Sequence, residues 1–168
     1  KIILTNGAII LWGDSILESL IFKNSNIYNF SIGGETVGLL KNRVKKIKYP
    51  DSCEIVIMIG INDFLFNIDI DITIKNFKDL IVFASSEKCF SNIYVLEILP
   101  ITKQGFFYNK DVINSSIQKF NNNISVLIEN RDNANLKLIS LYDLFKDENS
   151  NLKTDLTYDG IHLNSNGR

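Results

Sequence analysis

The chain has 168 residues, of which 45% are hydrophobic, and a formal net charge of −1. A chain of this length can bury about 70% of the surface that its unfolded form exposes, so residues 1–168 are predicted to form a single globular domain. The even charge balance offers no basic field for phosphate groups, which argues against a nucleic-acid partner, and no apolar run approaches the roughly 18 residues of a membrane span.

Five apolar runs alternate along the chain with segments of helical periodicity. They lie at residues 8–12, 26–32, 54–60, 92–98 and 136–141. This alternation is typical of βαβ units. The third run, "EIVIMIG" at 54–60, is apolar at nearly every position. Because a strand covered on both faces has that pattern, we expect this strand to be central.

Three intervening segments place their apolar residues on one helical face, which predicts crossover helices. These residues are Val37, Leu40, Val44 and Ile47; Ile70, Ile74, Phe77, Ile81 and Ala84; and Ile113, Ile117, Phe120, Ile124 and Leu127. Right-handed crossovers then predict a three-layer α/β/α sandwich around a five-stranded parallel sheet in the flavodoxin-like order 2-1-3-4-5. In such sheets, ligands bind at the carboxyl ends of the strands.

The first strand ends in Gly13-Asp14-Ser15. A glycine at this point permits a tight turn that lifts the Ser15 hydroxyl above the sheet, next to the start of a helix. Ser15 is therefore a candidate nucleophile. Taken alone, the motif is equally an ordinary helix N-cap, which is the more frequent use of Asp or Ser after a glycine turn.

Two further motifs follow the second and third strands. The stretch "NFSIGGET" at 29–36 contains Gly33-Gly34, and Gly60-Ile61-Asn62-Asp63 follows the third strand. The paired glycines either supply positive φ to a loop or let a backbone N–H approach a ligand closely. Asn62 either caps a turn or offers its amide as a donor at the sheet edge. Both interpretations stay open for each motif.

The fourth motif, "YDGIHLNSNG" at 158–167, contains the only histidine of the chain, His162. A lone histidine is more often a surface residue than a catalyst. Here, however, Asp159 stands three residues earlier, where its carboxylate can take the Nδ1 proton and leave Nε2 free to accept one. Together the four motifs supply a nucleophile, a base, an orienting acid and oxyanion donors at predicted strand ends or in the terminal segment.

The four motifs resemble the four sequence blocks of the SGNH hydrolases, also called the GDSL-like lipase/esterase family, and they run through nearly the whole chain. The resemblance implies a catalytic triad of Ser15, His162 and Asp159. It also implies an oxyanion hole built from the Ser15 and Gly34 backbone N–H groups and the Asn62 side chain.

Gly34 is chosen over Gly33 because the family places an acidic or polar residue, and then often a threonine, directly after this glycine; here they are Glu35 and Thr36. Family members usually continue into a final helix after the histidine block, whereas this chain stops at Arg168. The last helix is therefore expected to be missing or to lie outside this stretch of chain, which bears on the packing behind His162 but not on its identity.

The function implied by the resemblance is serine ester hydrolysis through an acyl-enzyme on Ser15, with no metal or organic cofactor. The family acts on acetylated sugars, lysophospholipids, thioesters and simple esters. A short chain without a long apolar lid favours a short acyl group, such as acetate, on a carbohydrate or other small ester. The alternatives are a lysophospholipase or thioesterase, an acyltransferase on the same triad, and a non-catalytic carbohydrate-binding module.

Two further expectations concern the surroundings of the site. Phe106, Phe107 and Tyr108 lie in the loop after the fourth strand and form a sugar-stacking wall, an acyl groove or a small satellite core. Activity is expected to fall in acid as His162 takes up a proton.

No signal peptide is visible, which favours a soluble, cytoplasmic protein.

Overall fold

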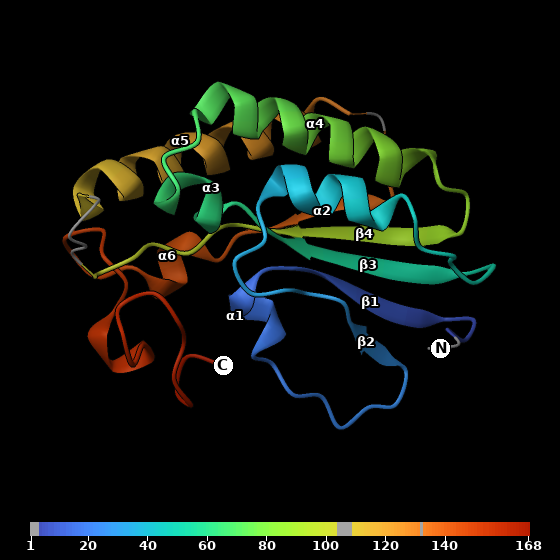
Figure 1. Ribbon diagram of the computed structural model, residues 1–168, viewed down its shortest axis with the longest axis horizontal. Coiled ribbons are helices and arrows are strands. Elements are labelled where there is room, and N and C mark those ends of the chain that lie inside the picture. The colour runs from blue at the N-terminus through green and yellow to red at the C-terminus, as the bar shows by residue number, and fades with distance from the viewer. Residues whose placement is uncertain (1–3, 104–108, 132) are drawn as a thin grey trace.

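The computed structural model describes residues 4–103, 109–131 and 133–168. Its five parallel strands form one sheet in the order β2-β1-β3-β4-β5 (Figure 1). The strands are β1 (Ala8–Gly13), β2 (Ile27–Asn29), β3 (Cys53–Met58), β4 (Phe90–Leu96) and β5 (Leu136–Ile139). The predicted flavodoxin-like order is confirmed, and β3 is the central strand as expected from its apolar run.

The helices form a layer on each side of the sheet. They are α1 (Ser15–Glu18), α2 (Val37–Val44), α3 (Ile61–Leu65), α4 (Ile70–Ser86), α5 (Lys110–Glu129), α6 (Tyr142–Phe145) and the 3-10 helix η1 (Thr154–Leu156). In Figure 1, α2, α4 and α5 cover one face, while α1 and the C-terminal segment lie on the other. The predicted three-layer arrangement is confirmed, although the second layer consists of short elements. Within the described part of the chain, no helix is both long and apolar enough to cross a bilayer.

The three predicted crossover helices are α2, α4 and α5, and each buries most of the apolar face expected of it, although Ile47 lies beyond the end of α2. Phe77, Ile81 and Ala84 of α4 are buried, as are Ile113 and Ile117 of α5. Burying a large aliphatic or aromatic side chain contributes about 1.5–3 kcal/mol, so these faces hold the helices against the sheet. The helices in turn fix the loops that follow the strands.

The core under β1 is aromatic. Trp12 is fully buried, and its ring centroid lies 5.5 Å from that of Phe90, 5.8 Å from that of Tyr49 and 6.4 Å from that of Phe83. Edge and offset aromatic contacts of this kind favour one fixed arrangement of the rings. The penultimate residue of β1 is therefore held firmly, two residues before Asp14.

The chain leaves β1 through a very close approach to β3. A Cβ atom on Gly13 would lie 2.5 Å from the Met58 carbonyl oxygen, so only glycine fits there without a shift of the backbone. Asp14 then caps α1, and its Oδ1 accepts the Ile16 N–H at 3.0 Å. As a result, Ser15 begins a helix directly at the carboxyl edge of the sheet.

Candidate active site

Ser15, His162 and Asp159 form one chain of hydrogen bonds. The Ser15 Oγ lies 2.8 Å from the His162 Nε2, and the His162 Nδ1 lies 2.7 Å from the Asp159 Oδ2. The side chains of His162 and Asp159 are 29% and 28% exposed, so solvent and small molecules can reach the imidazole. The structure thus brings the three predicted triad residues together from opposite ends of the chain.

The turn that carries Asp159 and His162 is organised by its own polar groups. The Asp159 Oδ1 accepts the backbone N–H groups of Ile161 at 3.0 Å and His162 at 2.8 Å. The Thr157 hydroxyl donates to the His162 carbonyl at 2.6 Å and accepts the Gly160 N–H at 2.8 Å. The Asp159 Oδ1 therefore fixes the turn, and the Asp159 Oδ2 fixes the imidazole.

These contacts also set the charge of Asp159. Partial burial by itself would raise the pKa of Asp159, but the hydrogen bonds from the His162 ring and from the His162 and Ile161 N–H groups outweigh it. The pKa of Asp159 consequently lies below its usual value. An ionised Asp159 accepts the Nδ1 proton of His162 and leaves the lone pair of Nε2 directed at Ser15.

The loop after β2, residues 31–35, contains Gly33 and Gly34 and is called the glycine loop; it passes beside Ser15. A Cβ atom placed on Gly33 would lie 3.7 Å from the Ser15 Cβ. Gly34 has φ of +77° in a turn closed by the Glu35 N–H donating to the Ile32 carbonyl at 3.1 Å. Within the described residues, no acceptor takes the backbone N–H groups of Ser15, Gly33 or Gly34. These donors remain available to a ligand.

Asn62 lies in the first turn of α3 and is 7% exposed. Its Nδ2 donates to the Glu35 carbonyl at 3.0 Å, which joins the end of β3 to the glycine loop. A primary amide has two N–H groups, so the second can serve a ligand. The next residue makes a parallel contact, because the Asp63 Oδ2 accepts the Val37 N–H at 2.9 Å.

Two buried carboxyl groups lie beneath this arrangement. Burial raises the pKa of Asp14 to about 7, although the Ile16 N–H and the nearby His162 act in the opposite direction. Burial likewise raises the pKa of Asp63 to about 6, against the hydrogen bonds from Val37 and Thr73. Both residues are only 1% exposed, so they lie under the surface of the site and do not contact a ligand.

The turn that carries Asp159 and His162 is attached to the segment that follows β4. The Gly160 carbonyl accepts the Thr102 N–H at 2.8 Å and the Lys103 N–H at 3.2 Å. Gly160 has φ of +86°, and a Cβ atom there would lie 2.7 Å from the Lys103 N and Cβ atoms. The backbone of this turn therefore packs directly on the backbone of the segment after β4.

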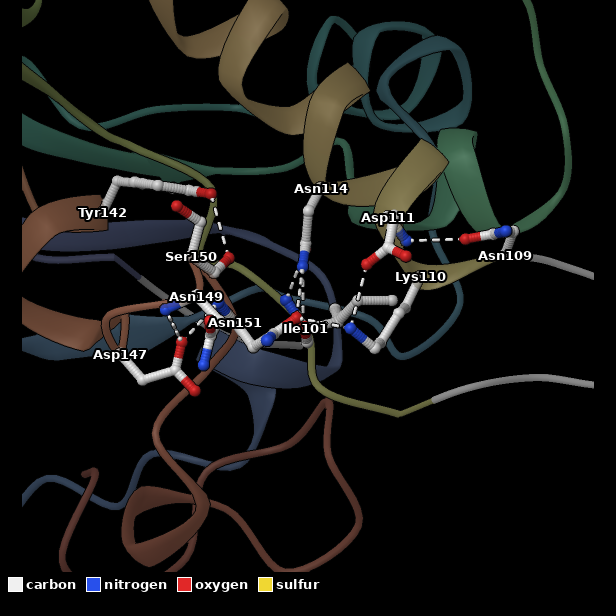
Figure 2. Close-up of polar contacts among 10 residues, drawn as sticks. All are labelled: Ile101, Asn109, Lys110, Asp111, Asn114, Tyr142, Asp147, Asn149, Ser150 and Asn151. Atoms are coloured by element: carbon white, nitrogen blue, oxygen red, sulfur yellow. Dashed lines mark hydrogen bonds and ion pairs between the residues drawn. The ribbon is translucent and has the colours of Figure 1, made fainter.

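Two asparagines of α5 hold that segment in place. The Asn114 Oδ1 and Nδ2 pair with the N–H and the carbonyl of Ile101, each at 2.8 Å (Figure 2). About two turns further along the same helix, Asn121 pairs with the N–H and carbonyl of Ile98 at 3.0 and 2.9 Å. Both asparagines are at most 5% exposed. They satisfy main-chain groups that a buried loop would otherwise leave unpaired.

Figure 2 also shows Asn114 reaching Asn151 beyond α6, where the Asn151 Oδ1 accepts from the Asn114 Nδ2 at 3.4 Å and from the Lys110 Nζ at 2.9 Å. Sequence reasoning missed Asn114 and Asn121. Their spacing of seven residues on an otherwise apolar helical face is the one signal that could have indicated two buried polar contacts.

One exposed aromatic ring stands beside the triad. The Tyr158 ring lies 5.8 Å from the His162 imidazole at an interplanar angle of 13° and is 65% exposed. The predicted aromatic residues Phe106, Phe107 and Tyr108 lie outside the described residues. In the parts of the chain that the structure describes, no three His, Cys, Asp or Glu side chains gather into a possible metal site.

The chain matches a known family over almost its whole length. The model of the GDSL-like lipase/acylhydrolase family matches residues 11–168. Among solved structures, a GDSL-like lipase from Bacteroides thetaiotaomicron is 21% identical, with a TM-score of 0.80 over 95% of this chain and 81% of that one. An acetylxylan esterase from Geobacillus stearothermophilus is 17% identical, with a TM-score of 0.73 over 98% of this chain and 90% of that one. At these identities the two structures support the fold.

A curated relative matches part of the chain. An N-acylneuraminate cytidylyltransferase from Escherichia coli is 37% identical over 95 residues, which make up 56% of this chain and 20% of the relative. The chain thus spans about a fifth of the length of this relative.

Proposed function

This chain belongs to the GDSL-like lipase/acylhydrolase family and is an SGNH-type esterase, and we propose that it hydrolyses short acyl esters through an acyl-enzyme on Ser15. The observation that carries the proposal is the unbroken chain of hydrogen bonds from the Asp159 Oδ2 through both nitrogens of His162 to the Ser15 Oγ. Such a chain gives a serine the base that it needs to act as a nucleophile.

In the proposed mechanism, the Ser15 Oγ attacks the ester carbonyl carbon while the His162 Nε2 takes the hydroxyl proton. The charged imidazole is stabilised by Asp159. When the tetrahedral intermediate collapses, the carbon–oxygen bond to the alcohol breaks, and His162 returns the proton to the departing alcohol. A water molecule, deprotonated by His162, then attacks the acyl-enzyme and releases the acid together with the free Ser15 hydroxyl.

We assign the oxyanion hole to the backbone N–H groups of Ser15 and Gly34 and to the side-chain amide of Asn62. Three features support this assignment: the two N–H groups have no acceptor among the described residues, the glycine loop passes beside Ser15, and Asn62 has an N–H to spare. Fixed donors of this kind stabilise the negative charge that develops on the carbonyl oxygen. The mechanism requires neither a metal nor an organic cofactor.

For the substrate, we propose an acetyl ester on a carbohydrate. The fold similarity to an acetylxylan esterase points toward acetyl groups, and the exposed Tyr158 ring beside His162 offers a flat surface on which a sugar can stack. Longer acyl groups, as in a lysophospholipase or thioesterase, and transfer to a second alcohol use the same triad and are the alternatives.

The partial match to an N-acylneuraminate cytidylyltransferase favours one particular carbohydrate. We propose an O-acetylated N-acylneuraminate as the second substrate candidate. Its carboxylate distinguishes it from a neutral xylan fragment, so acetate release from the two sugars can be compared directly on the same enzyme.

The first test uses wild-type protein and Ser15→Ala on p-nitrophenyl esters from acetate to palmitate, with circular dichroism to show that both are folded. We expect hydrolysis of the acetate ester by the wild type and none by the variant. A preference for long chains would favour the lipase alternative. If neither protein hydrolysed any ester, the transferase or the non-catalytic carbohydrate-binding module would replace the esterase.

A further inference from the structure

The guanidinium of Arg43, on α2, contacts both ends of the glycine loop. Its Nη2 donates to the Phe30 carbonyl at 2.7 Å, where the chain leaves β2. Its Nε donates to the Glu35 Oε1 at 2.7 Å, and the Nη2 also pairs with the Glu35 Oε2. One side chain thus spans the loop from the residue before it to the residue that closes it. The planar fork of arginine suits this, since it holds several acceptors in fixed directions.

Glu35 connects this ion pair to two of the proposed oxyanion donors. Its N–H closes the turn onto Ile32, which places Gly34 at φ of +77°. Its carbonyl accepts the Nδ2 of Asn62 at 3.0 Å. The orientation of the Gly34 N–H and the rotamer of Asn62 therefore both depend on where the backbone of Glu35 lies.

The Glu35 side chain is 5% exposed and needs a partner in that position. A buried carboxylate without a counterion is strongly unfavourable, and it would move toward water or take up a proton. Either response would shift the backbone that Gly34 and Asn62 share. Because oxyanion donors act only when they are held where the charge develops, a small displacement is expected to reduce the rate.

We propose that Arg43 is a positioning residue for the oxyanion hole, which acts through Glu35 on the Gly34 N–H and the Asn62 amide. This inference rests on the proposed esterase function. It assigns an effect on catalysis to the ion pair between Arg43 and the buried Glu35, whereas a purely structural ion pair would affect stability alone.

Helix α2 offers a matched control. Lys41 lies two residues before Arg43, is 16% exposed in its side chain, and donates to Asn76 at 2.7 Å and to Asp79 at 3.2 Å on α4. Replacing Lys41 by methionine removes a paired cation from the same helix without touching the glycine loop. Any effect of losing charge or packing on α2 itself will therefore appear in both variants.

The experiment compares Arg43→Met, Arg43→Lys and Lys41→Met with the wild type on p-nitrophenyl acetate. For Arg43→Met we expect kcat to fall by at least about tenfold, because two donors are displaced, with KM within about twofold of the wild-type value. The kcat of Arg43→Lys should lie between those of the wild type and Arg43→Met, since a lysine can bond to only one end of the loop at a time. Lys41→Met should retain the wild-type kcat, although its melting temperature can fall.

A double-mutant cycle then separates positioning from a general loss of structure. In an Asn62→Ala background, Arg43→Met should cost a smaller factor in kcat than in the wild type, because one of the donors that it positions is already gone. Equal factors in both backgrounds, or a kcat for Arg43→Met equal to that of Lys41→Met, would overturn the inference.

If Arg43→Met does not fold, Glu35→Gln replaces it in the same cycle, since it keeps the size of the side chain and removes the ion pair. Equal factors in both backgrounds, or a kcat for Glu35→Gln equal to that of Lys41→Met, would then overturn the inference. An inactive wild-type enzyme would overturn the proposed function and this inference with it. An active wild type with an unaffected arginine variant would overturn this inference alone.

Discussion

The Oγ of Ser15 lies 2.8 Å from the Nε2 of His162, although the two residues are 147 positions apart in the chain. The contact forms because β1 ends at the same edge of the sheet to which the segment after β4 holds the His162 turn. The imidazole is held from its other side by Asp159 at 2.7 Å. The reactivity of Ser15 therefore depends on which nitrogen of His162 carries the proton.

Replacing Asp159 by asparagine should move the proton of the neutral His162 ring from Nδ1 to Nε2. The amide can donate to Nδ1, which favours the tautomer that is protonated on Nε2 and unable to accept the Ser15 proton. We expect kcat on p-nitrophenyl acetate to fall by a factor on the order of 10²–10⁴, with the fold retained by circular dichroism. Asp155→Asn, which alters an exposed carboxylate in the preceding turn, is the control and should keep full activity. Equal activity in the two variants would contradict the role of Asp159.

Truncation of Asn62 should remove one oxyanion donor. For Asn62→Ala we expect kcat to fall by about 10²–10³ with little change in KM, because the donor matters most when the carbonyl oxygen becomes charged. The variant also loses the hydrogen bond to the Glu35 carbonyl, so its unfolding by urea must be measured alongside. A rise in KM with an unchanged kcat would instead assign Asn62 to ground-state binding.

Replacing Asn114 should weaken the fold and the triad together. Asn114→Leu keeps the size of the side chain but leaves the N–H and carbonyl of Ile101 buried without partners, at a cost of about 1–3 kcal/mol for each group. The free energy of unfolding in urea should fall accordingly. Because the segment after β4 carries the Gly160 contacts, kcat should fall as well.

The control for Asn114 lies on the same helix. The side chain of Asn123 is half-buried and, among the residues that the structure describes, donates only to the Lys119 carbonyl within its own helix. Asn123→Leu should change the free energy of unfolding by less than about 1 kcal/mol and leave kcat unchanged. A loss of stability equal to that of Asn114→Leu would contradict the special position of Asn114.

The buried carboxyl of Asp14 predicts a pH-dependent stability. Its pKa is about 7 in the folded protein, against 3.8 when unperturbed, because burial disfavours the charged form. Well below pH 4 the group is protonated in both states. Between pH 4 and 7 only the unfolded state ionises, so this group destabilises the fold increasingly as the pH rises, by an amount on the order of 4 kcal/mol above pH 7.

Asp14→Asn removes this ionisation and keeps an oxygen that can accept the Ile16 N–H. Relative to the wild type, the variant should therefore gain stability between pH 4 and pH 8, as measured by urea unfolding at both values. The comparison uses the difference between the two proteins, so the titration of groups that do not interact with Asp14 cancels. A difference that is the same at both pH values would mean that Asp14 ionises normally in the fold.

The layout of the sheet was predictable because apolar patterns record burial. The run at 54–60 predicted a central strand, and β3 is central. The strand predicted from the run at 26–32 was too long, because β2 ends at Asn29. The Phe30 and Ile32 N–H groups nevertheless still donate to carbonyl groups of β1. Phe30 packs against the core beyond the end of β2, whereas Ile32 is exposed, so the apolar run there overstated the length of the strand.

The support of the site was harder to predict than its principal residues. Ser15, Asn62 and His162 stand in motifs with characteristic neighbours. In contrast, Arg43 pairs with a loop residue eight positions earlier, and Asn121 pairs with the main chain of Ile98, 23 positions earlier. Such residues pair with main-chain atoms of distant segments, and periodicity carries no information about partners that meet only in the folded chain.

The position of Trp12 gives this protein a spectroscopic property. It is the only tryptophan of the chain, it is fully buried, and it lies three residues before Ser15. Its fluorescence should therefore peak at short wavelength, resist quenching by acrylamide, and shift to longer wavelength when β1 leaves the core. A single emission spectrum then reports whether the strand beneath the nucleophile is intact, before any substrate is added.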